Sequence, residues 1–421
     1  MHKILRNQLI SKSTLNTLLT LFITLLPFNV GKIVSDKIAH FGGIHINYLQ
    51  IRINLIDLVA LIIVTLFVLK NTKESRKIGK YMVLIPLTLL LPSLIFLFNE
   101  HSFTLKLLRV LLFAISFTIK LTALLIFLRQ FISEESTKFK KQLLYGIYFS
   151  STVQLILSIL QIVLKSPIPF RLLTILGQPP RFTSFFYLNL EQIPRAYGTT
   201  AHPNILGGVV GFYLILLFSL RSNKQNDYKL TKLPLYLILT TTLFLTISKS
   251  AILGVVAVAI FILLQKSLKI TINFKKYSII IPLVISMSSV LLLFLTNAIC
   301  KHIYFVEMRI LILRMYSEII TLKQIFAGSG VLSSVPNLLK SQTMLKTSLL
   351  YNSSLLIEPI HNSFLLAIYE IGVMPFLILL FQIQRLFSTL LTQSKQEANI
   401  FLISILIFAG VVAGFDHYLW Y

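Results

Sequence analysis

The sequence predicts an all-α protein that crosses a lipid bilayer about eleven times, as a single membrane domain over residues 1–421. Hydrophobic residues make up 56% of the chain and its mean hydropathy is +0.83. A soluble domain of this length cannot bury that much apolar surface. Several apolar runs also reach the roughly 17–20 residues that cross a hydrocarbon core about 30 Å thick. Both observations therefore favour a polytopic helical membrane protein.

The apolar runs divide into eleven predicted spans, which short polar segments separate. They lie at about residues 14–30, 53–69, 81–98, 107–128, 143–164, 204–220, 233–247, 250–265, 277–297, 361–381 and 398–415. The two shortest spans, 233–247 and 250–265, are joined only through the tripeptide SKS.

The basic residues predict the orientation of these spans. The formal net charge is +25, from 39 Lys and Arg against 14 Asp and Glu. If the N-terminus is cytoplasmic, the inside segments hold 22 of those 39 basic residues in about 78 positions. Cytoplasmic loops of membrane proteins collect Lys and Arg in this way, so we expect the N-terminus inside and the C-terminus outside. The bilayer explains the charge without a nucleic-acid partner.

Two connecting segments are much longer than ordinary helix connections, and the predicted orientation places both outside. They are external loop 1, residues 165–203, and external loop 2, residues 298–360. Long loops on a helical scaffold tend to carry function. The single cysteine, Cys300, excludes an internal disulfide and a thiolate metal site.

Four local patterns occur in one order along the chain. They are RAYGTTAHPNILGG at 195–208, SKSAILG at 248–254, RILILRMYSEIITLKQIFAGSG at 309–330 and HNSFLLAIYEIG at 361–372. Together they resemble the O-antigen ligase/polymerase family of bacterial membrane glycosyltransferases. The resemblance covers residues 195–415. The chain departs from the family pattern at Lys249, where an arginine is usual, and it ends at DHYLWY, whereas family members often continue.

The resemblance implies a GT-C-like arrangement in the cytoplasmic (inner) membrane of a bacterium. Such enzymes move a glycan from undecaprenyl diphosphate to an acceptor hydroxyl on the outer face, and they need neither a metal ion nor a cofactor. The acceptor is another glycan, a lipid or a protein, and the patterns do not separate ligase, polymerase and protein O-glycosylation. The expected activity is an inverting glycosyl transfer.

The resemblance also implies site residues. An external histidine serves as the base, here His361, because an imidazole accepts a proton near neutral pH. External arginines hold the diphosphate, because fixed cations stabilise the charge of a phosphate leaving group. The residues expected to bind the diphosphate are Arg195, Arg309, Arg314 and Lys249, with His202, Asn362 and Arg181 as secondary candidates.

Simpler readings remain open for several of these residues. His361 is an interfacial histidine in one reading, and His202 only caps the helix that Pro203 begins. Arg314 and Glu318, spaced i,i+4, pair with each other in another reading. Repeated glycines in the GSG at 328–330 are typical of a tight turn.

Two ionisable residues fall inside predicted spans, Lys120 and Glu370. Nine helical steps place Glu370 on the face opposite His361, so a continuous helix prevents it from orienting that imidazole. We expect Glu370 to play a structural part, with Lys120 as one candidate partner. Intramembrane charges also fit a transporter or flippase of lipid-linked glycans, which is the alternative function.

Overall fold

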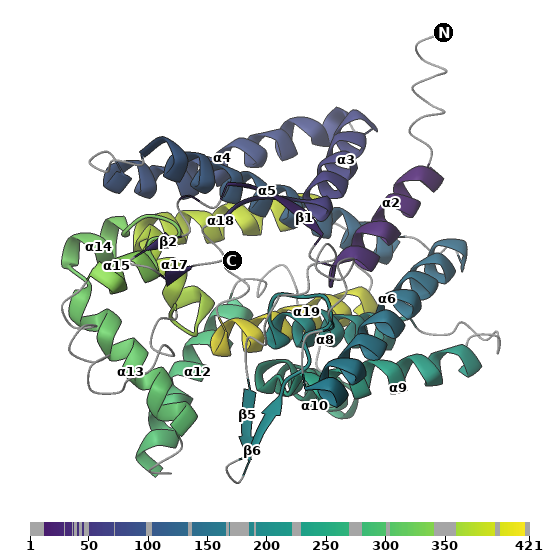
Figure 1. The fold of residues 1–421 in the computed structure, drawn as a ribbon. Coiled ribbons are helices and arrows are strands. Elements are labelled where there is room, and N and C mark those ends of the chain that lie inside the picture. The colour runs from purple at the N-terminus through teal and green to yellow at the C-terminus, as the bar shows by residue number, and fades with distance from the viewer. Residues whose placement is uncertain are drawn as a thin grey trace.

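The computed structural model describes most of the chain and is predominantly helical (Figure 1). The residues described are 12–28, 30–35, 37, 40–41, 44–45, 50–70, 72–97, 103–133, 137–165, 168, 185–188, 191–220, 229–268, 280–299, 304–340, 359–391 and 396–416. Of the residues proposed from the sequence, Arg181 lies outside these ranges.

Fifteen helices occur in the described residues. In chain order they are α2 (Lys12–Leu25), α3 (Leu55–Lys70), α4 (Thr72–Leu97), α5 (Phe103–Ser133), α6 (Thr137–Leu164), α8 (Pro203–Ser219), α9 (Lys229–Thr246), α10 (Lys249–Leu268), α12 (Ile280–Ile299), α13 (Tyr304–Ile319), α14 (Leu322–Ala327), α15 (Ser334–Lys340), α17 (Ser363–Ile371), α18 (Val373–Leu390) and α19 (Gln396–Phe415).

The connecting segments also contain short antiparallel ladders, which the all-α prediction did not include. β1 (Gly31–Ser35) pairs with β4 (Ile51–Asn54), β2 (His40–Phe41) with β3 (Ile44–His45), and β5 (Phe185–Leu188) with β6 (Glu191–Pro194). Each sheet has two strands. The segment predicted as the second long loop likewise contains helices, because α13, α14 and α15 all lie between residues 298 and 360.

Several helices have the length and composition needed to cross a bilayer. Among the described residues, six meet both conditions, at 76–94, 104–133, 137–164, 249–268, 373–390 and 398–415. Three shorter apolar helices cover residues 203–219, 232–246 and 280–292. The fold thus fits a multi-pass helical membrane protein, whereas the count of eleven spans stays a prediction.

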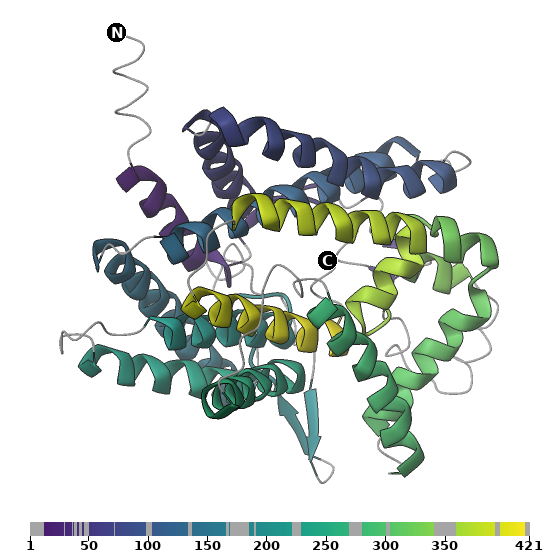
Figure 2. The same ribbon diagram turned by 180° about the vertical axis from the view of Figure 1, so that it is seen from behind.

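The helices lie in two groups (Figures 1 and 2). α4, α5 and α18 run alongside one another on one side, and α6, α8, α9, α10 and α19 gather on the other. In the second group small residues permit close packing: Gly211 of α8 and Gly254 of α10 both lie against the ring of Phe408 on α19. A side chain at either glycine would overlap that ring, so this contact fixes how deeply α19 sits between the two helices.

The predicted span 361–381 is two helices, not one. α17 ends and α18 begins at Gly372, whose φ of +84° belongs to the left-handed region that favours glycine. A Cβ atom there would overlap the carbonyl oxygen of Phe326 and the amide of Gly328. The break therefore comes from the close approach of the 328–330 turn, in which Gly328 and Gly330 also have positive φ.

Glu370 is held by backbone amides of this same region. Its side chain is fully buried, and its carboxylate accepts hydrogen bonds from Leu332 N at 2.9 Å and Ser334 N at 3.3 Å. Ser334 begins α15, and the first N–H groups of a helix have no acceptor within the helix. The Glu370 carboxylate supplies an acceptor for the N–H of Ser334. The structural reading of Glu370 thus has a physical basis, but its suggested partner Lys120 was wrong.

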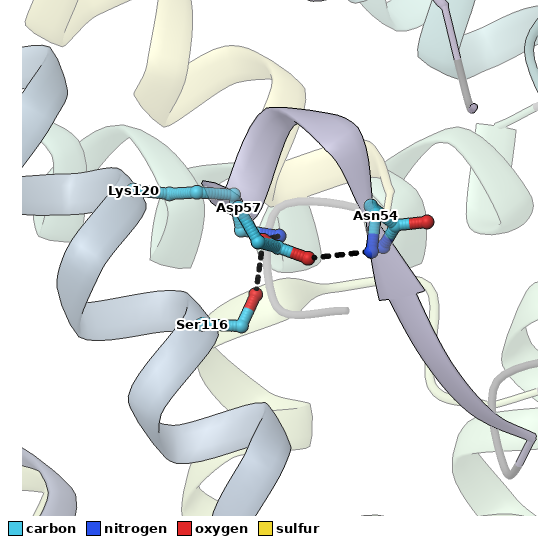
Figure 3. A network of polar contacts seen from close by, with 4 residues as sticks. All are labelled: Asn54, Asp57, Ser116 and Lys120. Atoms are coloured by element: carbon cyan, nitrogen blue, oxygen red, sulfur yellow. Dashed lines mark hydrogen bonds and ion pairs between the residues drawn. The ribbon is translucent and has the colours of Figure 1, made fainter. Parts of the chain in front are cut away.

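Lys120 pairs with Asp57 instead (Figure 3). Its Nζ lies 3.4 Å from Asp57 Oδ1, which also accepts a hydrogen bond of 2.7 Å from Ser116 Oγ. The other carboxylate oxygen accepts from Asn54 N at 3.2 Å. Ser116 and Lys120 are one helical turn apart on α5, so both face Asp57 in the first turn of α3. This network ties α3 to α5.

Candidate functional site

The ends of several helices meet in the region where the sequence predicts a site. α8 begins after His202, α9 ends and α10 begins around residues 246–249, α17 begins after Asn362, and α19 ends at Phe415. The hydrogen bonds described below join these ends directly. Arg195, His202 and Asn362 therefore belong to one region of the fold.

Arg195 joins the segment before α8 to the corner between α9 and α10. Its Nε donates to Thr246 O at 3.0 Å, and its Nη2 donates to Ile247 O at 3.2 Å. The same nitrogen lies 2.5 Å from Asn204 Oδ1. Carbonyl groups at the end of a helix lack internal donors, and a guanidinium with five N–H groups suits them. Arg195 thus has a clear structural part as well as a positive charge in the region.

A buried carboxylate lies on the far side of Asn204. Asn204 Nδ2 donates a hydrogen bond to Asp416 Oδ2, and Ser363 Oγ donates to the backbone oxygen of Asp416 at 2.7 Å. The Asp416 side chain is fully buried. Asp416 was not among the residues predicted from the sequence, although a single acid directly after an apolar span, in AGFD, was a usable signal.

Asn362 holds α17 against its neighbours. Its Oδ1 accepts from Phe364 N and Leu365 N, which makes Asn362 the N-cap of α17. Its Nδ2 donates to Ser286 O at 3.1 Å and to Gly414 O at 3.2 Å. Both N–H groups of this amide are used within the protein. We therefore assign Asn362 a positioning part beside His361, not direct contact with a substrate.

His202 is the N-cap of α8, and its protonation state follows from its surroundings. Its Nδ1 accepts a hydrogen bond of 3.2 Å from Asn204 N, and Pro203 follows as the first helical residue. Burial lowers the pKa of His202 well below 6.5, and its interactions with Arg195 and His361 lower it further. The imidazole is therefore neutral near pH 7, with its hydrogen on Nε2.

His202 and His361 differ in whether they can act as a base. Because the lone pair on His202 Nδ1 is used by the cap, His202 presents an N–H donor through Nε2 and no second acceptor. His361 is half-buried and lies close enough to His202 to affect its charge electrostatically. The His361 ring does not cap α8, so His361 remains the candidate base.

Three cations from different segments complete the region. Lys249, at the start of α10, interacts electrostatically with both Arg309 and Arg195. Arg309 lies on α13 and is 7% exposed, whereas Lys249 is exposed. We call Arg195, Lys249 and Arg309 the cationic cluster. Like charges held together in a protein repel each other, so such a cluster favours an anionic ligand.

The other proposed arginine of α13 does not join the cationic cluster. Arg314 follows Arg309 by five residues, which is about 140° around the helix, and it is exposed. Glu318 is exposed as well, and within the described side chains no ion pair joins it to Arg314. The i,i+4 pairing is therefore absent here, and Arg314 faces away from the buried side of α13.

No model of a known protein family matches the chain, and no similar protein is found among curated sequences. The chemistry of the region is therefore inferred from its residues alone. It offers three cations, a neutral histidine that donates through Nε2, a second histidine beside it, and one buried carboxylate.

Proposed function

We propose that the protein transfers a glycan from undecaprenyl diphosphate to an acceptor hydroxyl at the outer face of a bacterial cytoplasmic membrane. The observation that carries this proposal is that Lys249 interacts electrostatically with Arg195 and Arg309, while Arg195 and His361 both act on His202. These residues come from the four sequence patterns that resemble the O-antigen ligase/polymerase family. Their approach to one another supports the resemblance, because nothing in the sequence alone requires it.

The proposed step is an inverting displacement. The acceptor oxygen attacks the anomeric carbon while the bond from that carbon to the diphosphate oxygen breaks. His361 takes the hydroxyl proton, and the diphosphate leaves with the electron pair. The cationic cluster stabilises the negative charge that develops on the diphosphate, as fixed cations do for phosphate leaving groups. The sugar carbon acquires oxocarbenium character, as in glycoside hydrolysis.

The finer topology belongs to this proposal. Eleven spans, a cytoplasmic N-terminus and an external C-terminus would put the cationic cluster at the outer face, where the lipid-linked donor is presented. A GT-C-like arrangement would follow. The acceptor class stays open among glycan, lipid and protein.

The experiment compares two arginines of the same helix. Arg309→Ala removes a buried cation of the cluster, whereas Arg314→Ala removes an exposed one about 140° away. Purified variants are incubated with an undecaprenyl-diphosphate-linked glycan and an acceptor, and the new glycosidic bond is followed by gel mobility or mass spectrometry. We expect Arg309→Ala and His361→Ala to lose at least about 100-fold in rate, while Arg314→Ala stays within about threefold. Full activity in folded Arg309→Ala and His361→Ala proteins would overturn the proposal.

One structural observation favours the alternative function, a transporter or flippase. Asp57 and Lys120 form an ion pair between α3 and α5, and ion pairs in membrane helices mark some transport paths. Vesicles reconstituted with the purified protein distinguish the two functions. Movement of a lipid-linked glycan across the vesicle membrane without any new glycosidic bond would favour the transporter.

A further inference from the structure

Two glutamines of α6 hold the loop that connects Arg195 to His202. The middle of that loop, residues 196–200, is buried, and the backbone of a buried loop needs hydrogen-bond partners. Ala196 N donates to Leu245 O on α9, and Thr200 N donates to Tyr197 O. The amides of residues 197–199 between them donate to Gln154 and Gln161. These two glutamines lie seven residues apart and therefore on one face of α6.

Gln161 binds the first half of the loop. Its Oε1 accepts from Tyr197 N at 3.1 Å and from Gly198 N at 2.9 Å. Its Nε2 donates to Gly198 O at 2.8 Å. One buried side chain thus satisfies three backbone groups of two consecutive residues, which fixes the direction of the chain at Gly198.

Gln154 binds the second half. Its Oε1 accepts from Thr199 N at 3.0 Å, and its Nε2 donates to Thr199 Oγ1 at 2.7 Å. The threonine hydroxyl in turn donates to Pro27 O at 2.8 Å, just beyond the end of α2. The loop is therefore held between α6 and the end of α2.

Gly198 shows how closely the loop and α6 fit. Its φ of +54° lies in the left-handed region, and a Cβ atom at this position would overlap Gln154 Oε1. No other residue fits this conformation and this space without strain. The path from Arg195 to His202 is thus set by α6, a helix outside the 195–415 region that resembles the glycosyltransferase family.

We propose that Gln154 and Gln161 are positioning residues of the candidate site. They set the backbone of residues 197–199, and through it they place Arg195 against the α9–α10 corner and His202 at the start of α8. The predicted effect on catalysis rests on the proposed function, whereas the predicted effect on the loop does not. A displacement of about 1 Å in a binding group costs up to about 100-fold in rate. Loss of these hydrogen bonds should therefore lower the rate of glycan transfer.

The decisive variant is Gln161→Leu, which keeps the approximate size of the side chain and removes all three hydrogen bonds. The matched control is Gln382→Leu on α18. Gln382 is also a buried glutamine, but its Nε2 donates to Thr88 Oγ1 on α4 at 2.9 Å, in the other helix group. Thr199→Val is the second test variant, because it is nearly isosteric and removes the hydroxyl contacts to Gln154 Nε2 and Pro27 O, while the backbone N–H still donates to Gln154 Oε1.

Two measurements separate the loop from the chemistry. The first is the rate at which maleimide labels Ala201→Cys in a Cys300→Ser background, which needs no enzymatic activity. The second is the rate of glycan transfer per folded, monodisperse protein, with the KM for the lipid-linked donor determined separately. We expect Gln161→Leu to raise labelling and to lower transfer by about tenfold each, with Gln382→Leu near the unsubstituted protein in both. We expect Thr199→Val to change in the same directions if Gln161→Leu does not fold.

The outcomes are distinguishable. Faster labelling with slower transfer supports the positioning role. Labelling and transfer in folded Gln161→Leu and Thr199→Val that match the Gln382→Leu control overturn it, even if the unsubstituted protein is an active transferase. If the unsubstituted protein forms no glycosidic bond, the proposed function fails, and the labelling rates alone then decide whether the glutamines set the loop.

Discussion

Asn204 Nδ2 donates a hydrogen bond to Asp416 Oδ2, and this contact links the first turn of α8 to the end of α19 across 212 positions of sequence. The Oδ1 of the same asparagine accepts from Arg195. A neutral amide therefore separates a guanidinium from a buried carboxylate, and both charged groups keep a hydrogen-bond partner. The arrangement makes Asp416 the one acid that the described side chains bring into this region.

Replacement of Asp416 by alanine should destabilise the protein. The change leaves the half-buried side-chain amide of Asn204 without its acceptor and removes a negative charge from beside the cationic cluster. We expect a loss of about 2–4 kcal/mol in the free energy of unfolding. Thermal unfolding in detergent measures it, with Glu318→Ala, an exposed acid of α13, as the control. Equal stability of the two variants would contradict the assigned contact.

The neutral state of His202 predicts an acid-sensitive stability. Because burial and neighbouring positive charge lower its folded-state pKa below the unfolded value of about 6.5, the unfolded state binds the proton first as pH falls. Stability from this group is therefore complete above pH 6.5 and falls below it, by up to about 1.4 kcal/mol per pH unit. A protonated ring at a helix N-terminus is also unfavourable.

His202→Asn tests that prediction, because asparagine caps helices without titrating. We expect the variant and the unsubstituted protein to have similar unfolding free energies at pH 8. The variant should gain relative stability as the pH is lowered to 5. A difference that stays constant over this range would show that His202 does not titrate abnormally. Denaturant unfolding at each pH supplies the measurement.

The sequence predicted much of the helical scaffold because apolar length is a local property. The predicted spans at 143–164, 250–265 and 398–415 all fall within helices that are long and apolar enough to cross a bilayer. The break at Gly372 was not predicted, since it depends on the 328–330 turn, which packs against it from a distant part of the chain. The β ladders were missed because two-stranded pairs this short leave little periodic signal.

The site was predicted only in part, for a comparable reason. Charged residues in loops beside spans, such as Arg195 and Arg309, stand out in an apolar sequence. Gln154 and Gln161 do not stand out, because the role of two amides in a long apolar helix depends on the distant loop that they bind. Asn204 is likewise an ordinary polar residue until Arg195 and Asp416 are seen on either side of it.

The Asp57–Lys120 pair predicts an asymmetry between its two partners (Figure 3). Asp57 accepts hydrogen bonds from Ser116 and from Asn54 N as well as pairing with Lys120. Asp57→Ala removes all three interactions, whereas Lys120→Met removes one and leaves a carboxylate with two donors. We expect Asp57→Ala to cost at least about 2 kcal/mol and Lys120→Met to cost clearly less.

Unfolding of both single variants and the double variant measures this difference. Because the partners interact, the double variant should cost less than the sum of the two single changes, by about 1 kcal/mol or more. Strict additivity would show that the ion pair contributes nothing to the packing of α3 on α5.

Two glycines should respond in opposite directions to the same substitution. Gly372 has a φ of +84°, and a Cβ atom there would overlap Phe326 O, so Gly372→Ala must distort either the junction of α17 and α18 or the 328–330 turn. We expect a loss of at least about 1–3 kcal/mol. Gly208 lies inside α8 and has no neighbouring atom within 4 Å of a Cβ position. Gly208→Ala should therefore raise stability by about 0.5–1 kcal/mol, because alanine favours the helix. Thermal unfolding of the two variants side by side gives the comparison, and a stable Gly372→Ala protein would mean that the two helices join without the left-handed residue.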